Sequence, residues 1–379
     1  MNQKISIDLF PLSIASGEAF CNRIDETERL KICIAHHRPV LLVSPRRYGK
    51  TSLALHGIKQ SEFPYAHIDF FSAVDEEDLE YAILRGIGKL ISSLESAPQK
   101  ALALATDFFS GTHIRAVLSK LGISIEIDNQ REKPSQRILK VLERLEKFSE
   151  KTQKKLVLFF DEFQCIGEIA DDQSMESVLR QVAQLTQSIS FVFSGSNRHL
   201  LGQLFDDRKR PFYKLCERIT IERIEASHYI PHIQKAAVDT WKQPLSEEVL
   251  ESLFSCSERH PYYVNLLCSR VLLEKKIPSA EVINQLWCQY VMEERSGVAS
   301  ELDMLSRNQK KLLTMLAREH GTRSPFGQNF VQKSRMSKAT VAQALGVLEQ
   351  HDYVEKLSDG NITIIDPLIK AVLSGEISF

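Results

Sequence analysis

The chain has 379 residues, with 48 lysine and arginine residues against 49 aspartate and glutamate residues, so its formal net charge is −1. A content of 43% hydrophobic and 26% charged residues is ordinary for a soluble globular protein and excludes disordered, collagenous and coiled-coil chains. The near-zero net charge excludes a generally basic coat for nucleic acid or membranes. No apolar run reaches the ~18 residues that a membrane helix needs.

The seven cysteines lie far apart, are odd in number and include no C-x-x-C pair. This usage argues for reduced thiols and against both a disulfide framework and a zinc site. The first residues contain neither a sustained apolar stretch nor a cleavage signature, so we expect no signal peptide. Together these features predict a cytoplasmic location.

The first two-thirds of the chain alternates short apolar segments with amphipathic stretches. We expect strands at 40–43, 66–71, 156–160, 190–193 and 219–221, and helices after Thr51 and at 79–94 and 175–187. Apolar strands that alternate with helices predict an α/β fold, in which helices cover both faces of a parallel sheet. This first domain is expected over 1–225, and the segment 97–135 within it resembles an insertion of unknown role.

The strand at 40–43 is followed by a loop similar to the phosphate-loop pattern G-x-x-x-x-G-K-[ST]. The residues that would contact a nucleotide there are Ser44, Pro45, Arg46, Arg47, Tyr48, Gly49, Lys50, Thr51 and Ser52. Ser44 replaces the first glycine of the pattern, a small change in bulk. Backbone N–H groups would face the phosphates, Lys50 would reach the β- and γ-phosphates, and Thr51 would bind Mg²⁺. The alternative is a plain strand–turn–helix with a solvated lysine.

Two acids follow the apolar strand at 156–160. Burying Asp161 and Glu162 at the end of a strand is costly unless a cation is present. Asp161 would therefore hold Mg²⁺, directly or through water, and Glu162 would act as the general base for the attacking water. The alternative is a strand that ends in a solvated acidic turn.

Small polar residues follow the strand at 190–193. Because ligands bind at the carboxyl ends of parallel strands, Ser196 or Asn197 would contact the γ-phosphate or the water. A turn that caps the strand is the alternative interpretation for each of them.

These motifs resemble the archaeal-type ATPase family within the AAA+/STAND group of P-loop NTPases. The loop SPRRYGKTSL is similar to the family's GPRRxGKTSL. The segments that also match are Phe20, Arg23, Glu26 and Leu30 in the pattern F-x-x-R-x-x-E-x-x-x-L, then 159–164, 194–196 and 259–263. The resemblance covers about 20–268 in scattered blocks. It implies that Arg23 lies near the adenine and that Pro261, in a turn of a helical lid, packs on the nucleotide.

Arginine residues that would stabilise the transition state are Arg208, Arg210 and Arg218, and we single out Arg210. In AAA+-like proteins such an arginine often comes from a neighbouring subunit. The alternative is an ordinary charged loop. His260 would contact phosphate from the lid or would cap a helix.

The strand pattern stops near residue 226, and helical periodicity over 226–298 corresponds to the lid. From 299 to 379 three helical stretches precede a hairpin with Asp359-Gly360 in its turn, which is the winged-helix layout. Residues 301–379 hold ten basic and nine acidic residues. Arg323, Lys333, Arg335 and Lys338 form a modest basic face, so protein contact is as plausible a role as DNA binding.

The sequence thus predicts a P-loop NTPase core, a helical lid and a C-terminal winged helix. The expected function is hydrolysis of ATP with Mg²⁺, in a switch or motor that acts on a nucleic-acid or protein client. The alternative is a non-hydrolysing, nucleotide-gated DNA-binding regulator or a protein-interaction scaffold. A nucleotide-dependent homo-oligomer is also among the expected partners.

Overall fold

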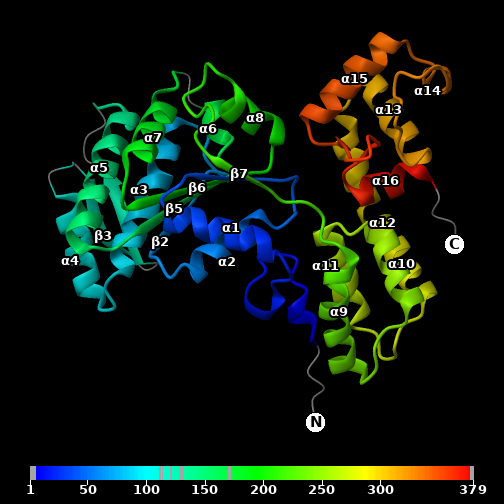
Figure 1. Ribbon diagram of the computed structural model, residues 1–379, viewed down its shortest axis with the longest axis horizontal. Coiled ribbons are helices and arrows are strands. Elements are labelled where there is room, and N and C mark those ends of the chain that lie inside the picture. Colours follow the sequence, from blue (N-terminus) through cyan, green and yellow to red (C-terminus); the bar gives the residue numbers. More distant parts are fainter. Residues whose placement is uncertain are drawn as a thin grey trace. The chain divides into compact units, whose positions relative to one another are not determined.

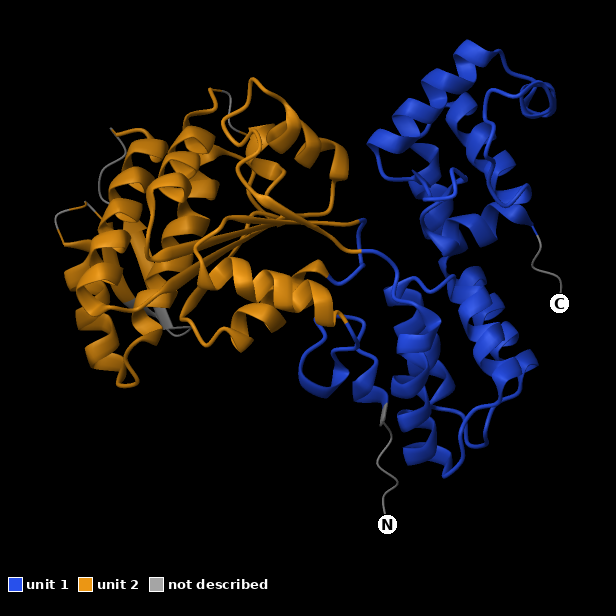
Figure 2. Ribbon diagram, in the orientation of Figure 1, with its two compact units in different colours: residues 1–22, 45–49, 222–379 blue, residues 23–44, 50–221 orange. Residues whose placement is uncertain are grey.

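A computed structural model describes residues 6–110, 112, 114–119, 122–127, 132–169 and 172–375. The chain forms two compact units, drawn in different colours in Figure 2. Unit 1 comprises residues 1–22, 45–49 and 222–379, and unit 2 comprises residues 23–44 and 50–221. The predicted lid and winged helix therefore belong to one unit, together with five residues of the phosphate loop.

Unit 2 is built on a five-stranded parallel sheet with the strand order β2-β5-β6-β1-β7. The strands are β1 (Val40–Val43), β2 (Tyr65–Asp69), β5 (Leu156–Asp161), β6 (Ile189–Gly195) and β7 (Glu217–Thr220). Every residue of β1, β5 and β6 is buried. Their continuous apolar runs fit a sheet that is covered on both faces.

Helices cover both faces of this sheet, as Figure 1 shows. Those of unit 2, apart from one in the insertion, are α1 (Ile24–Ala35), α2 (Lys50–Gln60), α3 (Glu76–Ser93), α5 (Pro134–Thr152), α6 (Cys165–Ile169), α7 (Ser174–Leu185) and α8 (Arg198–Asp206). Helix α1 packs on α2, and α5 packs on α3 and α7. Right-handed crossovers in the observed strand order place these two groups on opposite faces.

The predicted insertion at 97–135 contains structure that the sequence pattern did not indicate. It forms α4 (Pro98–Phe109) and an antiparallel hairpin of β3 (Ile114–Ser119) and β4 (Gly122–Ile127). Positions 111, 113, 120, 121 and 128–131 of this segment lie outside the described residues. Phe108, Phe109 and Ile125 join the apolar core of unit 2, so the insertion extends that core.

Unit 1 begins with two short 3-10 helices and continues with the predicted lid. Its elements up to residue 303 are η1 (Ser6–Leu9), η2 (Gly17–Ala19), α9 (Ala226–Trp241), α10 (Glu247–Ser257), α11 (Pro261–Val271) and α12 (Ala280–Asp303). Helix α12 continues beyond residue 298, the predicted end of the lid, and Leu302 in this extension is also buried in the apolar core.

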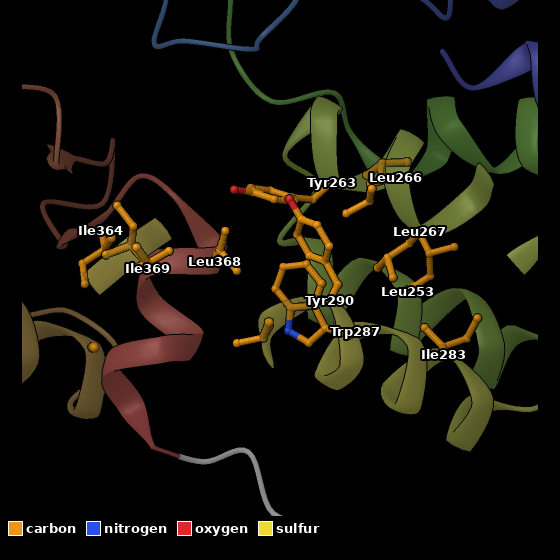
Figure 3. Close-up of a cluster of buried hydrophobic side chains, with 14 of the residues drawn as sticks. Leu253, Tyr263, Leu266, Leu267, Ile283, Trp287, Tyr290, Ile364, Leu368 and Ile369 are labelled. Atoms are coloured by element: carbon orange, nitrogen blue, oxygen red, sulfur yellow. The ribbon is translucent and has the colours of Figure 1, made fainter. Parts of the chain in front are cut away.

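The winged helix follows within the same unit. Its elements are α13 (Arg307–Arg318), α14 (Gln328–Ser334), α15 (Lys338–Gln350), β8 (Val354–Lys356), β9 (Ile362–Ile364) and α16 (Pro367–Ser374). One apolar cluster joins this domain to the lid, as Figure 3 shows for Tyr263, Leu368 and Ile369. The hydroxyl of Tyr263 also donates a 2.7 Å hydrogen bond to Oδ1 of Asp366. Lid and winged helix therefore share one core.

Within the described part of the chain, no helix combines the length and the hydropathy that a membrane crossing requires.

Candidate functional site

Strands β1, β5 and β6 are neighbours in the sheet of unit 2 and run in the same direction. Their carboxyl ends therefore meet at one edge, where ligands bind in open parallel sheets. Three of the predicted motifs follow these strands: the loop that starts at Ser44, the acids Asp161 and Glu162, and the turn at 194–197. The sheet order brings them together.

Asp161 and Thr51 form the central contact of the site. The Thr51 hydroxyl, in the first turn of α2, donates a 2.6 Å hydrogen bond to Oδ2 of Asp161 at the end of β5. The Ser194 hydroxyl donates to Oδ1 of the same carboxylate. His67 places Nε2 3.6 Å from Oδ2, and its ring stacks on Phe159 at a centroid distance of 4.8 Å. The two residues predicted to hold Mg²⁺ are thus in direct contact.

Asp161 is ionised at neutral pH although its exposed fraction is only 5%. Burial by itself would raise the pKa of this carboxyl group. The hydrogen bonds from His67, Ser194 and Thr51 outweigh that effect and hold the pKa below its usual value. The site therefore presents a fixed negative charge.

Lys50 is the first residue of α2 and is buried. Its Nζ donates to the carbonyl oxygen of Ser44 at 3.0 Å and to the Ser44 hydroxyl at 3.2 Å. The serine that replaces the first glycine of the loop pattern therefore contacts the lysine directly. Gly49, just before Lys50, has φ +90°, a conformation that favours glycine and turns the loop into the helix.

Glu162 is held in place by two neighbours. Its Oε2 accepts a 2.7 Å hydrogen bond from the Ser196 hydroxyl and a 2.6 Å bond from Nε2 of Gln164. Its backbone is in the left-handed region, with φ 51°, and its N–H donates to Oδ1 of Asp161. A non-glycine residue in this conformation carries strain that its surroundings must support. Ser196 therefore lies beside Glu162.

Gln164 belongs to this arrangement but was not singled out from the sequence. It is buried, and a Cβ atom at Gly195 would lie 2.1 Å from its Oε1. Gly195 thus leaves the space that lets Gln164 reach Glu162. Gln164 and Gly195 are far apart in the sequence and meet only because β5 and β6 are adjacent. Spacing in the sequence could therefore not reveal their contact.

Asn197, Arg210 and Arg23 have other partners in this structure. The Asn197 side chain accepts a 3.0 Å hydrogen bond from the Leu200 N–H and so caps α8. Arg210 forms a 2.5 Å ion pair with the buried Glu176. Arg23 precedes α1 and pairs with Glu26 at 3.0 Å. Their predicted roles toward a nucleotide remain predictions.

The other two arginine candidates are Arg218 and Arg208. Arg218 donates to both carboxylate oxygens of Asp206, at 2.9 and 2.8 Å. Arg208 is exposed.

The middle of the phosphate loop, residues 45–49, packs within unit 1. The guanidinium of Arg47 lies 4.3 Å from the ring centroid of Tyr262. The ring of Tyr48 meets that of His260 edge-on at 4.8 Å, and its hydroxyl accepts a 3.0 Å hydrogen bond from Nε of Arg223. The loop therefore contacts α11 of the lid, where the resemblance places a nucleotide contact.

Arg223 is a second residue that the sequence did not single out. Its Nη1 donates to the Glu258 carbonyl at 2.7 Å and to the Glu258 carboxylate at 3.1 Å. Its Nη2 donates to the Ile365 carbonyl at 2.8 Å, just after β9 of the winged helix. One side chain thus joins the phosphate loop, the lid and the winged helix. Only the fold brings these three segments together.

His260 is 3% exposed and precedes Pro261, the first residue of α11. Burial, with the charges of Arg223 and Arg47 adding to it, lowers its pKa to about 3, so the ring is neutral at physiological pH. Its side chain makes no capping hydrogen bond to the helix. His260 is thus the N-cap residue of α11, as one of its two alternatives predicted, although its side chain takes no part in the capping.

The basic face expected on the winged helix is smaller than the sequence suggested. Arg323 pairs with Asp359 at 2.6 Å, and Lys333 pairs with Glu319 at 2.9 Å. Glu319 and Asp359 both lie outside the segment 323–338 that carries these cations, and the fold brings them beside it. Arg335 and Lys338 have no ion-pair partner among the described residues.

Comparisons with known proteins agree with this architecture. Residues 299–375 match the family described as "probable winged helix domain". The Walker-type ATPase paby2304 of Pyrococcus abyssi matches with a TM-score of 0.68 and 17% identity, covering 96% of this chain and 99% of that one. The ORC2 protein of Aeropyrum pernix, in ADPNP and ADP complexes, matches with a TM-score of 0.57 and 12% identity over 97% of both chains. A search of curated protein sequences finds no match. The expected fold is therefore confirmed: the chain shares its fold with the Walker-type ATPase paby2304 and carries a winged-helix domain over residues 299–375.

Proposed function

We propose that this protein binds ATP together with Mg²⁺ and hydrolyses it to ADP and phosphate, and that the nucleotide switches its lid and winged helix. The observation that carries this proposal is the contact between Thr51 and Asp161 beside a Glu162 held by Ser196. A hydroxyl and an ionised carboxylate supply the hard oxygen ligands that Mg²⁺ prefers. The ADPNP and ADP complexes of the Aeropyrum pernix ORC2 protein, which has a similar fold, support nucleotide binding.

The donor set fits magnesium in particular. No group of three or more histidine, cysteine, aspartate or glutamate residues able to hold a metal exists among the described residues. Mg²⁺ does not require such a cage, because it usually takes one or two protein ligands, substrate phosphates and water. Thr51 and Asp161 would hold the ion, which when bound neutralises charge on the phosphates.

Glu162 is the group that we assign to the attacking water. Its carboxylate orients the water and accepts a proton as the water oxygen bonds to the γ-phosphorus. The bond from that phosphorus to the β–γ bridging oxygen breaks, and ADP leaves. Ser196 and Gln164 both bind Oε2 of Glu162, which fixes the orientation of the carboxylate. Lys50 would balance charge on the β- and γ-phosphates.

Nucleotide turnover tests the proposal directly. In Lys50→Ala, binding of ATP or its hydrolysis should be lost, whereas Lys59→Ala, on an exposed residue of the same helix, should match the unmodified protein. Glu162→Gln keeps the side-chain shape but removes the base. It should bind ATP normally and hydrolyse it at least ~100-fold more slowly. Unchanged turnover in Lys50→Ala would refute the proposed site, and unchanged turnover in Glu162→Gln would remove Glu162 from the mechanism.

The winged helix is the part of the chain that we propose contacts the client of the switch. A winged helix supports binding of duplex DNA through α15, but two of the four cations of the basic face are neutralised by Asp359 and Glu319. We therefore retain both a protein and duplex DNA as candidate clients. Filter binding of duplex DNA over a salt series separates them, because binding through phosphates weakens steeply as salt rises. No binding at low salt, or a flat salt response, would favour the protein client.

A further inference from the structure

A cavity of about 270 Å³ lies at the edge of unit 2. Strand β2 is the last strand on that side of the sheet. The end of this strand, the loop that follows it and helix α3 line the cavity, which involves His67, Asp69, Asp78, Tyr81, Arg85 and Lys89. His67 also approaches Asp161, and Asp69 is the register partner of Asp161 in the sheet, whereas none of the phosphate-loop residues lines the cavity.

On the side of helix α3, the cavity is lined by one aromatic and two cationic side chains. Tyr81, Arg85 and Lys89 are exposed and follow one another at intervals of four residues on α3, so they lie on one face of that helix. Among the described residues, neither Arg85 nor Lys89 has an ion-pair or hydrogen-bond partner. Like charges four residues apart destabilise a helix slightly. An anion that binds between them would reverse that cost.

The two acids of the cavity are engaged differently. Oδ1 of Asp69 accepts a 2.9 Å hydrogen bond from the N–H of Phe71, and Oδ2 of Asp78 accepts a 3.0 Å bond from the N–H of Val74. Both carboxylates therefore hold the backbone of the loop between β2 and α3. The donors of Arg85 and Lys89 remain available to a ligand.

The strand side of the cavity adds backbone groups. Within β2 and its flanks, the Pro64 carbonyl and the Phe70 N–H pair with strand β5. Backbone groups of a parallel strand point alternately to its two neighbours, so those of His67 and Asp69 point away from β5, toward the open edge.

We propose that this cavity is a second binding site, for a small ligand that carries a phosphate group. Arg85 and Lys89 bind the phosphate through charge-assisted hydrogen bonds, and Tyr81 covers one side of it. The volume is just below the ~300–1,000 Å³ of sites for drug-sized ligands, which suits a short phosphorylated molecule and excludes a folded macromolecule. This proposal does not rest on the proposed ATPase activity.

Direct binding measurements test this site without relying on turnover. They use the full chain with Lys50→Ala, which weakens the phosphate loop, and titrate inorganic pyrophosphate and ribose 5-phosphate by calorimetry. The test variant is Arg85→Gln/Lys89→Gln. Its matched control is Lys147→Gln/Arg180→Gln, which removes the same charge from two exposed positions of unit 2 outside the cavity. Thermal unfolding checks that both variants fold.

At least one of the two probes should bind the Lys50→Ala protein and the control variant equally, and should bind Arg85→Gln/Lys89→Gln at least tenfold more weakly. Binding of pyrophosphate alone would identify a bare anion as the ligand, and tighter binding of ribose 5-phosphate would identify a phosphorylated sugar. The proposal is overturned if neither probe binds the Lys50→Ala protein, or if Arg85→Gln/Lys89→Gln binds as tightly as the control. The two proposals can fail separately. If Lys50→Ala loses ATP hydrolysis but still binds pyrophosphate through Arg85 and Lys89, the two functions belong to different sites.

Discussion

Thr51 and Asp161 are 110 positions apart in the chain, yet the hydroxyl of the first lies 2.6 Å from Oδ2 of the second. The contact exists because β5 and β1 flank β6 in the sheet, so the start of α2 meets the end of β5. It orients a hydroxyl and a carboxylate toward each other. Such preorganisation lowers the cost of assembling a metal site.

Asp161→Asn should reduce magnesium-dependent ATP hydrolysis by about 100-fold or more, because the amide removes the fixed negative charge that would hold the ion. The amide also keeps the shape of the side chain, so the fold should persist. Steady-state turnover over a Mg²⁺ titration measures the effect, and Asp107→Asn, an exposed residue of α4, is the control. Turnover that matches the control at every Mg²⁺ concentration would argue against this metal assignment.

Gly195→Ala should destabilise unit 2 by about 1–3 kcal/mol, the usual cost of overpacking. The added Cβ would lie 2.1 Å from Oε1 of Gln164 and 3.1 Å from Cδ2 of Leu201. Because Gln164 is the nearer obstacle, Gly195→Ala/Gln164→Ala should cost less than the two single changes added together. Urea unfolding of the four proteins gives this coupling, and strict additivity would contradict the predicted clash.

Much of this architecture follows from sequence patterns. Apolar runs that are followed by recognisable motifs predicted β1, β5 and β6, and the three helical stretches predicted before a hairpin correspond to α13, α14 and α15. These elements depend on local periodicity and capping, for example by Ser337, whose side chain accepts a hydrogen bond from the Thr340 N–H. The winged-helix layout could be predicted for the same reason.

What the sequence could not predict depends on contacts between distant segments. Gln164 reaches Glu162 because Gly195 lies on the adjacent strand, and Arg223 meets Ile365 only after the winged helix has folded onto the lid. The sequence pattern did not predict the hairpin of β3 and β4, because this hairpin interrupts a run of helices. Ion pairs between Lys333 and Glu319, and between Arg323 and Asp359, likewise changed the charge expected on the winged helix.

The stability of unit 1 should fall in acid because of His260. Its pKa is lowered from 6.5 to about 3 in the folded chain, mainly by burial. A histidine with a lowered pKa stabilises the fold fully above pH 6.5, and this contribution is lost as the pH falls from there toward 3. The loss approaches about 1.4 kcal/mol per pH unit in that window.

His260→Phe should flatten this part of the pH dependence, because phenylalanine fills a similar space beside Tyr48 and Tyr263 without a group that titrates. Chemical unfolding at pH 7 and pH 5, followed by a signal from unit 1, measures the difference. His351→Gln, at an exposed position, is the control. An equal loss of stability in His260→Phe and in the unmodified protein would exclude His260 as the source.

Arg223→Met should uncouple the phosphate loop from the winged helix. Methionine keeps much of the apolar stem but removes the donors to Tyr48, Glu258 and Ile365. Hydrogen bonds from a charged donor contribute about 1.5–3 kcal/mol each. We therefore expect a lower unfolding temperature for unit 1, together with a loss of any nucleotide effect on the winged helix.

Hydrogen exchange of β8 and β9 with and without ATP measures that coupling. The control is Arg270→Met, which removes an arginine from α11 that pairs with Glu293 at 2.7 Å and, among the described residues, forms no hydrogen bond or ion pair with the loop. The control should lose little stability, because that pair is partly exposed, and should keep the nucleotide effect. If Arg223→Met retains the same nucleotide-dependent protection of the hairpin as Arg270→Met, the connection runs through other residues, of which the contact of Arg47 with Tyr262 is the next to test.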